Sequence, residues 1–219
     1  MATPTTRDNI IAYLDDCLTK DHPADMRQFD LNNVDCSNLS FVRATFDDMI
    51  LKGVNFTGAA FTDCSFNNAN IIKSSFDGTD MKRVQFTHTD ITNTDFDEAL
   101  LNTVNLEHAV LTGNDFTDTR LYTINAKYAE LYDVWIERSH LSVVDLSYST
   151  IQITDFVKTA LYNVHFEHAK MGCVTFPGAT LTDVGFQHAM FEHADFDHAM
   201  LNNVKFDGVT LTGNIQQEG

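Results

Sequence analysis

Residues 51–76 read LKGVNFTGAAFTDCSFNNANIIKSSF, and a large apolar side chain stands at every fifth position of this stretch. Two places before each of them comes a small or β-branched residue, as Val54 comes before Phe56. The same five-residue pattern continues without a slip over residues 31–211. A period of five fits neither the 3.6-residue period of an α-helix nor the two-residue period of a β-strand. The stretch therefore predicts a repeat architecture.

A second period of twenty residues divides the large apolar residues into four columns. Two columns favour Phe, and the other two favour Leu, Ile and Met. One phenylalanine-rich column consists of Cys36, Phe56, Phe76, Phe96, Phe116, Ile136, Phe156, Phe176 and Phe196. The other consists of Phe46, Phe66, Phe86, Leu106, Ala126, Leu146, Phe166, Phe186 and Phe206. A coil with four sides of five residues explains both periods, whereas a five-residue pattern alone does not.

The repeated unit resembles that of the pentapeptide-repeat family, in which a small residue is followed by Asp or Asn and then by a large apolar residue. Val54-Asn55-Phe56 and Ala194-Asp195-Phe196 are examples, and the resemblance extends over residues 24–213. It implies an all-β fold, a right-handed quadrilateral β-helix with four pentapeptides per coil and about nine coils. Because each coil adds one strand spacing of about 4.8 Å, the rod should be roughly 45 Å long.

The chain is expected to divide into one repeat domain with short flanking segments. The predicted parts are an N-terminal segment at 1–22, the β-helix at 23–214 and a polar tail at 215–219. Residues 5–20 predict a short amphipathic helix that covers the first coil, with Thr5 and Asp8 as a capping box. A targeting or partner-binding helix is the alternative interpretation of the same segment. Glycines two places after large residues, among them Gly53 and Gly113, predict corners with positive φ.

Composition and charge narrow the class of function. The formal net charge of −17 over 219 residues disfavours direct binding to nucleic acid, which requires basic patches, and favours attraction to basic surfaces. The four cysteines contain no Cys-x-x-Cys pair, so neither a disulfide framework nor a zinc site is expected. The polar N-terminal residues resemble no signal peptide or membrane span, and a cytoplasmic protein is expected.

Catalysis finds little support in the sequence. No nucleophile elbow, phosphate loop or zinc-protease motif can be read, and a rod filled with Phe and Leu should leave no room for a substrate pocket. We therefore expect no enzyme activity, no cofactor and no metal. Four histidines share one corner column with two tyrosines between them, and we interpret them as stacked rings rather than metal ligands; they are His88, His108, His168 and His188.

Carboxylates recur on one outer side of the predicted rod. We call this set the acidic stripe, and its members are Asp95, Asp97, Asp115, Asp155, Asp195 and Asp197. Carboxylates that repeat along a narrow rod can imitate the charge of a DNA backbone. The alternative is that Asp and Asn belong to the repeat consensus and form local hydrogen bonds at the corners.

A second set of outward residues is aromatic and lies in the middle of the chain. We call it the aromatic belt, and its members are Tyr122, Tyr128, Tyr132, Trp135, Arg138, Tyr148 and Tyr162. Trp, Tyr and Arg are enriched at the hot spots of protein interfaces. The belt is therefore a candidate partner-binding site, with an aromatic ladder that steadies the coils as the alternative.

These observations leave two functional hypotheses. The best-known branch of the resembling family binds DNA gyrase and protects it from quinolones, which implies a DNA mimic that modulates gyrase or topoisomerase IV. The other hypothesis is a general protein-interaction scaffold or effector that uses the aromatic belt. In addition, the apolar end formed by Phe206, Val209 and Leu211 predicts a homodimer that stacks through the C-terminal coil.

Overall fold

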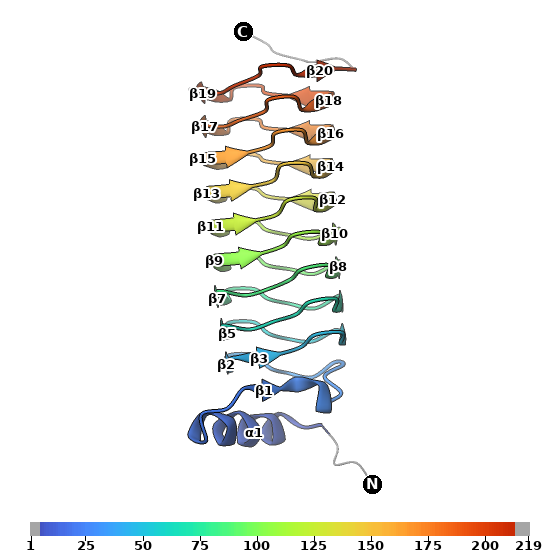
Figure 1. The fold of residues 1–219 in the computed structure, drawn as a ribbon, viewed down its shortest axis with the longest axis vertical. Coiled ribbons are helices and arrows are strands. Elements are labelled where there is room, and N and C mark those ends of the chain that lie inside the picture. The colour runs from blue at the N-terminus through green and yellow to red at the C-terminus, as the bar shows by residue number, and fades with distance from the viewer. Residues whose placement is uncertain (1–4, 213–219) are drawn as a thin grey trace.

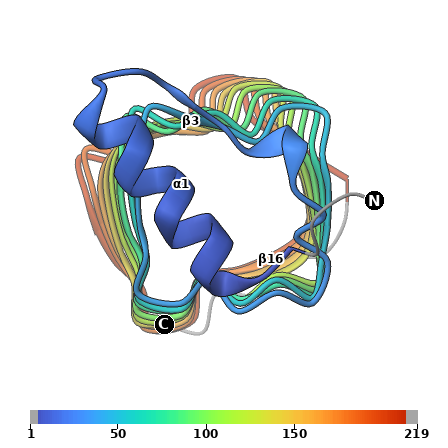
Figure 2. The ribbon, with the colours of Figure 1, turned by 90° about the horizontal axis from the view of Figure 1, so that it is seen from below.

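The chain winds into a rod of stacked coils, with a helix across one end (Figure 1). The computed structural model describes residues 5–212, and structural statements here refer to that part of the chain. Seen along its axis, the rod has a roughly four-sided outline (Figure 2). Parallel strands pair with partners twenty residues away, as Leu111 does with Leu131. The right-handed quadrilateral β-helix expected from the sequence is confirmed.

Two opposite sides of the rod are parallel nine-stranded sheets. The first sheet contains β4 (Ile50–Lys52), β6 (Asn70–Ile72), β8 (Asp90–Thr92), β10 (Val110–Thr112), β12 (Glu130–Trp135), β14 (Thr150–Asp155), β16 (Lys170–Thr175), β18 (Met190–Asp195) and β20 (Thr210–Leu211). The second sheet contains β2 (Ser40–Val42), β5 (Ala60–Thr62), β7 (Asp80–Lys82), β9 (Leu100–Asn105), β11 (Arg120–Asn125), β13 (His140–Asp145), β15 (Ala160–His165), β17 (Thr180–Thr182) and β19 (Met200–Asn202). A further pair, β1 (Ala24–Asp25) with β3 (Ala44–Thr45), lies near the helix.

The other two sides carry the phenylalanine-rich columns. We call the side with the column from Cys36 to Phe196 the stripe side, and the side with the column from Phe46 to Phe206 the groove side. On both sides the phenylalanine rings of neighbouring coils stack, with centroids 4.3–5.3 Å apart. Each buried Phe or Leu contributes about 1.5–3 kcal/mol of transfer free energy, so the stability of the rod is distributed along its length.

The corners of the coils have the positive φ that the sequence predicts. Gly53, with φ of +64°, shows why glycine suits such a corner, because an added Cβ would lie 2.6 Å from Asn33 Oδ1. Several corners in the middle of the rod instead hold β-branched residues, for which this conformation is strained. They are Thr103, Thr123, Val143 and Ile153, with φ of 60°, 57°, 59° and 50°.

The N-terminal helix α1 (Arg7–Thr19) lies across the first coil (Figure 2). It buries Ile10 and Cys17 against the core. The predicted capping box was wrong, because the N-cap is Thr6, whose hydroxyl accepts a hydrogen bond from Asn9 N. A short 3₁₀ helix, η1 (Met26–Gln28), leads from β1 toward the coils. No helix of the described residues has the length and apolar character needed to cross a membrane.

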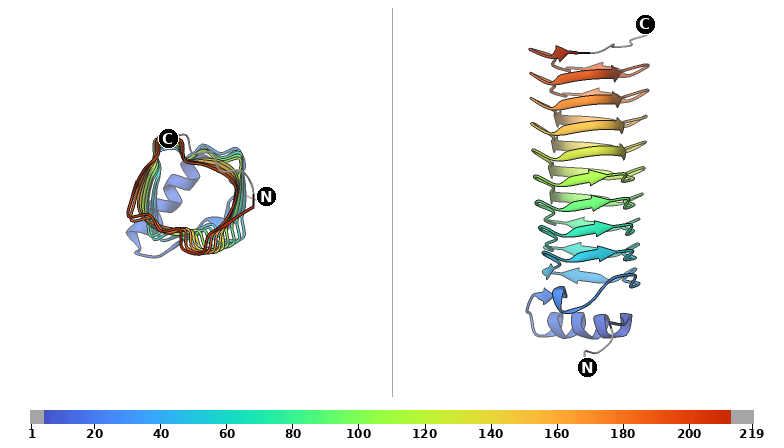
Figure 3. Two further views of the ribbon diagram at one scale, coloured as in Figure 1. Left: turned by 90° about the horizontal axis from the view of Figure 1, so that it is seen from above. Right: turned by 90° about the vertical axis from the view of Figure 1, so that its right-hand side faces the viewer.

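The other end of the rod is an open coil (Figure 3). Phe206 stacks on Phe186, yet Phe206 is 40% exposed and Leu211 56% exposed. Val209, the third residue of the predicted dimer end, is half-buried. The described residues therefore leave apolar side chains uncovered at this end, and the predicted tail at 215–219 lies outside them.

Candidate functional site

The acidic stripe follows one continuous column of the stripe side. Bridges join Asp95 to Asp115, Asp115 to Trp135 and Trp135 to Asp155, and β16 and β18 continue the column to Asp195. Asp97 and Asp197 each lie two places further along the chain, on the other flank of the phenylalanine column. Trp135 interrupts the column of carboxylates halfway along the rod.

Three stripe carboxylates are engaged in hydrogen bonds. Asp115 accepts a hydrogen bond from Thr117 N at 2.8 Å, and Asp195 accepts one from Asp197 N at 2.8 Å. Asp155 accepts one from the Thr175 hydroxyl of the next coil. The alternative interpretation, in which the repeat consensus places Asp for local hydrogen bonding, therefore applies to these residues.

The carboxylates around Asp95 and Asp97 differ from the others. Within the described residues the Asp95 carboxylate has no hydrogen bond, and one oxygen each of Asp77 and Asp97 is buried without a partner. Burial and the nearby charges of Asp77 and Asp115 raise the pKa of Asp95. Burial also raises the pKa of Asp97, and Asp115 and other acidic neighbours add to the effect. The stripe therefore contains a cluster of carboxylates that repel one another.

Arg138 borders this cluster on the following coil. Its guanidinium donates hydrogen bonds to both oxygens of Asp118, the shortest at 2.7 Å, and lies 3.4 Å from Glu137. This pairing holds the pKa of Asp118 below its usual range. Arg138, predicted as a partner-binding residue, is therefore already engaged within the rod.

The aromatic belt encircles the rod and does not form one surface. Tyr132 and Trp135 belong to β12, on the first sheet and at its edge with the stripe side. Tyr122 and Tyr162 lie in β11 and β15 of the second sheet. A single partner surface made of all seven belt residues is therefore wrong, because successive pentapeptides face different sides of the coil.

Tyr128 and Tyr148 belong to a ladder of rings at the corner between the groove side and the first sheet. The centroids of successive rings are 4.8–5.3 Å apart. The stacked rings are His88, His108, Tyr128, Tyr148, His168 and His188. The rings cover one another's faces, as the twenty-residue spacing predicts, so mainly their edges face solvent.

One part of the belt does form a compact patch. Tyr132 is 51% exposed and Trp135 is 39% exposed, on the same strand. Ile153, also exposed, lies on the paired strand β14, two residues before the partner of Trp135. We call these three residues the Trp135 patch. Asp115 and Asp155 border it one coil to either side, so an apolar surface lies inside an acidic column.

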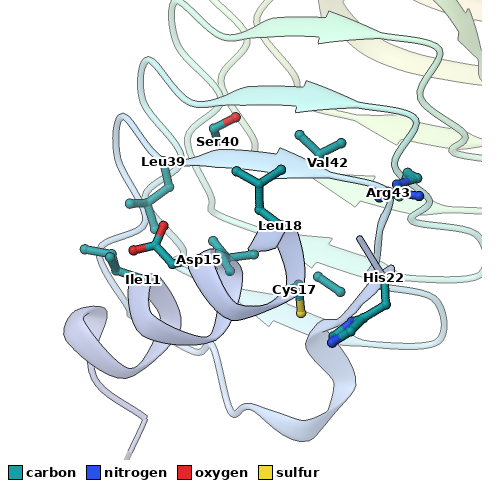
Figure 4. A pocket seen from close by; sticks show the side chains of 11 residues that line it. Ile11, Asp15, Cys17, Leu18, His22, Leu39, Ser40, Val42 and Arg43 are labelled. Atoms are coloured by element: carbon teal, nitrogen blue, oxygen red, sulfur yellow. The ribbon is translucent and has the colours of Figure 1, made fainter. Parts of the chain in front are cut away.

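The surface also contains hollows that the sequence did not predict. A groove of about 450 Å³ on the groove side is lined by Tyr162, His165, Glu167, Asp183, Gly185 and Lys205, among others. A hollow of about 140 Å³ lies between α1 and β2, where Leu18, Leu39 and Val42 face the same space (Figure 4). The expectation of a rod without pockets was therefore wrong. The available signal was Gly185, which stands in a column of longer side chains.

Comparison with known proteins agrees with this geometry. The model of the pentapeptide repeat region matches residues 59–131, and the model of eight pentapeptide repeats matches residues 30–68, 160–197 and 186–213. No curated protein matches the sequence.

Solved structures share the fold. QnrB1, a plasmid-mediated fluoroquinolone resistance protein, is 19% identical, with a TM-score of 0.58 over 80% of this chain and 89% of its own. HetL, a pentapeptide repeat protein involved in heterocyst differentiation regulation in the cyanobacterium Nostoc, is 18% identical over 79% of this chain and 87% of its own, with a TM-score of 0.38.

Proposed function

Because the chain belongs to the pentapeptide-repeat family, we propose that it is a non-enzymatic rod that binds a type II topoisomerase by mimicking duplex DNA. The stripe side is the surface that makes the contact, and DNA gyrase or topoisomerase IV is the partner. The observation that carries this proposal is the carboxylate cluster around Asp95 and Asp97, whose raised pKa values reflect burial and mutual repulsion.

The spacing of the cluster suits a DNA-binding groove. Duplex DNA carries one negative charge per about 1.7 Å of its axis. The coils of the rod repeat about every 4.8 Å, so two parallel acidic columns supply one charge about every 2.4 Å where both are filled. Asp77 and Asp97 fill one column, and Asp95 and Asp115 fill the other. A basic groove that accepts DNA would therefore meet a comparable density of charge.

The shared fold supports the choice of partner to test first. QnrB1 is a fluoroquinolone resistance protein with this fold, although its 19% identity carries no residue-level argument. The acidic cluster supplies that argument from this chain alone. Binding through it should weaken steeply as salt rises, because surface charges are screened.

The test is a gyrase supercoiling assay with the full chain, with and without a fluoroquinolone, over a series of salt concentrations. We expect inhibition or drug protection that disappears at high salt and in the double variant Asp95→Asn/Asp97→Asn. The matched control, Asp90→Asn/Glu130→Gln, removes the same charge from exposed positions of the first sheet and should retain the activity. Absence of any effect of the wild-type protein, or equal loss in both variants, would reject a specific acidic surface.

A second candidate function is protein scaffolding through the Trp135 patch, which the exposure of Tyr132, Trp135 and Ile153 favours. Binding of this kind depends on apolar burial and should change little with salt. A pull-down that compares wild type with Trp135→Ala, with Tyr122→Ala on the second sheet as control, separates the two surfaces. Partners that both proteins retain equally would exclude the patch.

The open C-terminal coil supports a homodimer in which two rods stack through Phe206, Val209 and Leu211. Such stacking would cover apolar side chains that the described residues leave exposed. Light scattering at micromolar concentration should give twice the chain mass, and Leu211→Asp should give the single-chain mass. A monomeric wild-type protein would contradict this assembly.

A further inference from the structure

The interior of the rod is not filled evenly. A cavity of about 40 Å³, here called the mid-rod cavity, lies inside the central coils. Its walls include Leu106, Leu121, Ala126, Leu131, Ile136 and Leu146, and no polar atom of the described residues lines it. It is distinct from the surface grooves, because its lining side chains point into the core.

The exposure of single side chains gives independent support for the cavity. Leu121 and Leu131 are each 6% accessible and Ile136 is 5% accessible, although all three belong to inward columns. In the coils on either side, core phenylalanines such as Phe66 and Phe166 have no accessible surface. The additional accessible area of the central residues is therefore internal surface that faces the cavity.

The sequence explains why the space is empty. The groove-side column holds Leu, Ala and Leu between Phe86 and Phe166, and Ala126 is the smallest residue of that column. One coil unit further, the stripe-side column replaces Phe with Ile136. The two ring stacks are thus interrupted at neighbouring levels, and no larger side chain compensates for the missing rings.

We propose that the mid-rod cavity is a binding site for a single small nonpolar molecule, of the size of xenon, dioxygen or methane. An apolar cavity stays dry because a water molecule inside would lack hydrogen-bond partners, although this one exceeds the roughly 10–15 Å³ that one water needs. A nonpolar guest loses no hydrogen bonds on entry and gains dispersion contacts with the lining side chains. Benzene is excluded by size, since a cavity that binds it measures about 150 Å³.

Xenon is the probe for this site, applied under pressure to the full chain with isotope-labelled Ile, Leu and Val methyl groups. We expect NMR shifts that saturate with xenon pressure and concentrate on methyl groups of Leu106, Leu121, Leu131 and Leu146. Shifts that rise linearly and spread over the surface of the rod would overturn the proposal.

Two filling variants and one control make the result specific. Ala126→Leu should abolish the saturating shifts, because Leu106 and Leu146 already occupy the same column one coil away. Ala126→Val, a smaller change, should weaken them and serves if the leucine variant folds poorly. Ala169→Val adds the same atoms at a fully buried position outside the cavity lining and should leave xenon binding intact. Saturating shifts that persist in both Ala126 variants would place the guest elsewhere.

Discussion

The central coils of the rod and the coils on either side of them place their aromatic residues differently. In the flanking coils, phenylalanine rings stack inside the rod on two sides. In the central coils the interior is aliphatic and contains a cavity, while Trp135 and Tyr132 lie on the outside. The same coil geometry therefore uses aromatic side chains for cohesion in one region and exposes them for contact in the other.

This difference teaches that a repeat can vary its packing without losing its register. Strand pairing twenty residues apart continues through the central coils, where β11 pairs with both β9 and β13. Main-chain hydrogen bonds between neighbouring coils do not depend on which apolar side chain faces inward. The backbone thus tolerates the cavity, and the stability of each region should depend on its own core.

The largest expected effect is the loss of a stacked ring from a flanking coil. Phe76 is fully buried between the rings of Phe56 and Phe96, so Phe76→Ala should lower the free energy of unfolding by about 3–5 kcal/mol. Denaturant unfolding measures the change. Leu121→Ala, beside the mid-rod cavity, is the matched comparison, and a loss greater than that of Phe76→Ala would contradict the difference between the regions.

Filling the cavity should have a smaller effect of opposite sign. A cavity costs about 24 cal/mol per Å³, so Ala126→Leu should raise the free energy of unfolding by about 1 kcal/mol for 40 Å³. The expected rise in Tm is about 2–4 °C. Ala169→Val, at a fully buried site, should instead lower Tm, because overpacking a filled core is destabilising. A lower Tm for both Ala126→Leu and Ala126→Val would mean that the central core is already filled.

Removing the external aromatic side chain should change stability less than removing the internal one. Trp135 is 39% exposed and lies outside the core, so Trp135→Ala should shift Tm by less than about 4 °C. Thermal unfolding followed by circular dichroism measures this shift. Unfolding of the variant at room temperature would show that Trp135 is structural and would remove the Trp135 patch as a separate contact surface.

The smallest expected effect concerns the acidic cluster on a flanking coil. Because the folded-state pKa of Asp97 is raised above its ordinary value of 3.8, its contribution to stability is fully present below that value and is lost as pH rises through the folded pKa. Asp97→Asn should therefore raise Tm at neutral pH and reduce the decline of stability with rising pH. The gain should shrink in high salt.

Asp118 provides the opposite-sign control for this experiment. Arg138 lowers its folded-state pKa, so its contribution is present above 3.8 and is lost as pH falls through the folded pKa. Asp118→Asn should lower Tm at neutral pH. If both variants shift Tm in the same direction, the charges of the two aspartates do not govern the changes.

The periodic features of the fold could be predicted from the sequence. The five-residue and twenty-residue periods gave the four columns, the pairing of Tyr128 with Tyr148 and the positive φ of the corners, because each position meets the same environment in every coil. The N-cap was placed one residue too early, since Thr5 and Thr6 are chemically equivalent candidates. Local side-chain chemistry does not decide between two adjacent hydroxyls.

The functional surface was harder to predict because it depends on distance around the coil. Tyr132 and Tyr162 are alike in sequence context but lie on opposite sheets. The engagement of Arg138 with Asp118 was readable from their twenty-residue spacing and was missed. The mid-rod cavity required four columns to be compared at one level. Ala126 was visible as a small residue, whereas its effect depended on the neighbours that failed to fill the space.

The position of α1 has a consequence for the order of events during synthesis. The helix covers the coil that is made first, whereas the coil formed by β19 and β20 is made last. At about 5–20 residues per second, a ribosome needs roughly 1–4 s to deliver the twenty residues of one coil. Helices and strand pairs form in microseconds, so each coil has time to settle on the previous one. The rod can therefore grow in a single direction from a covered start, like a stack laid from its base.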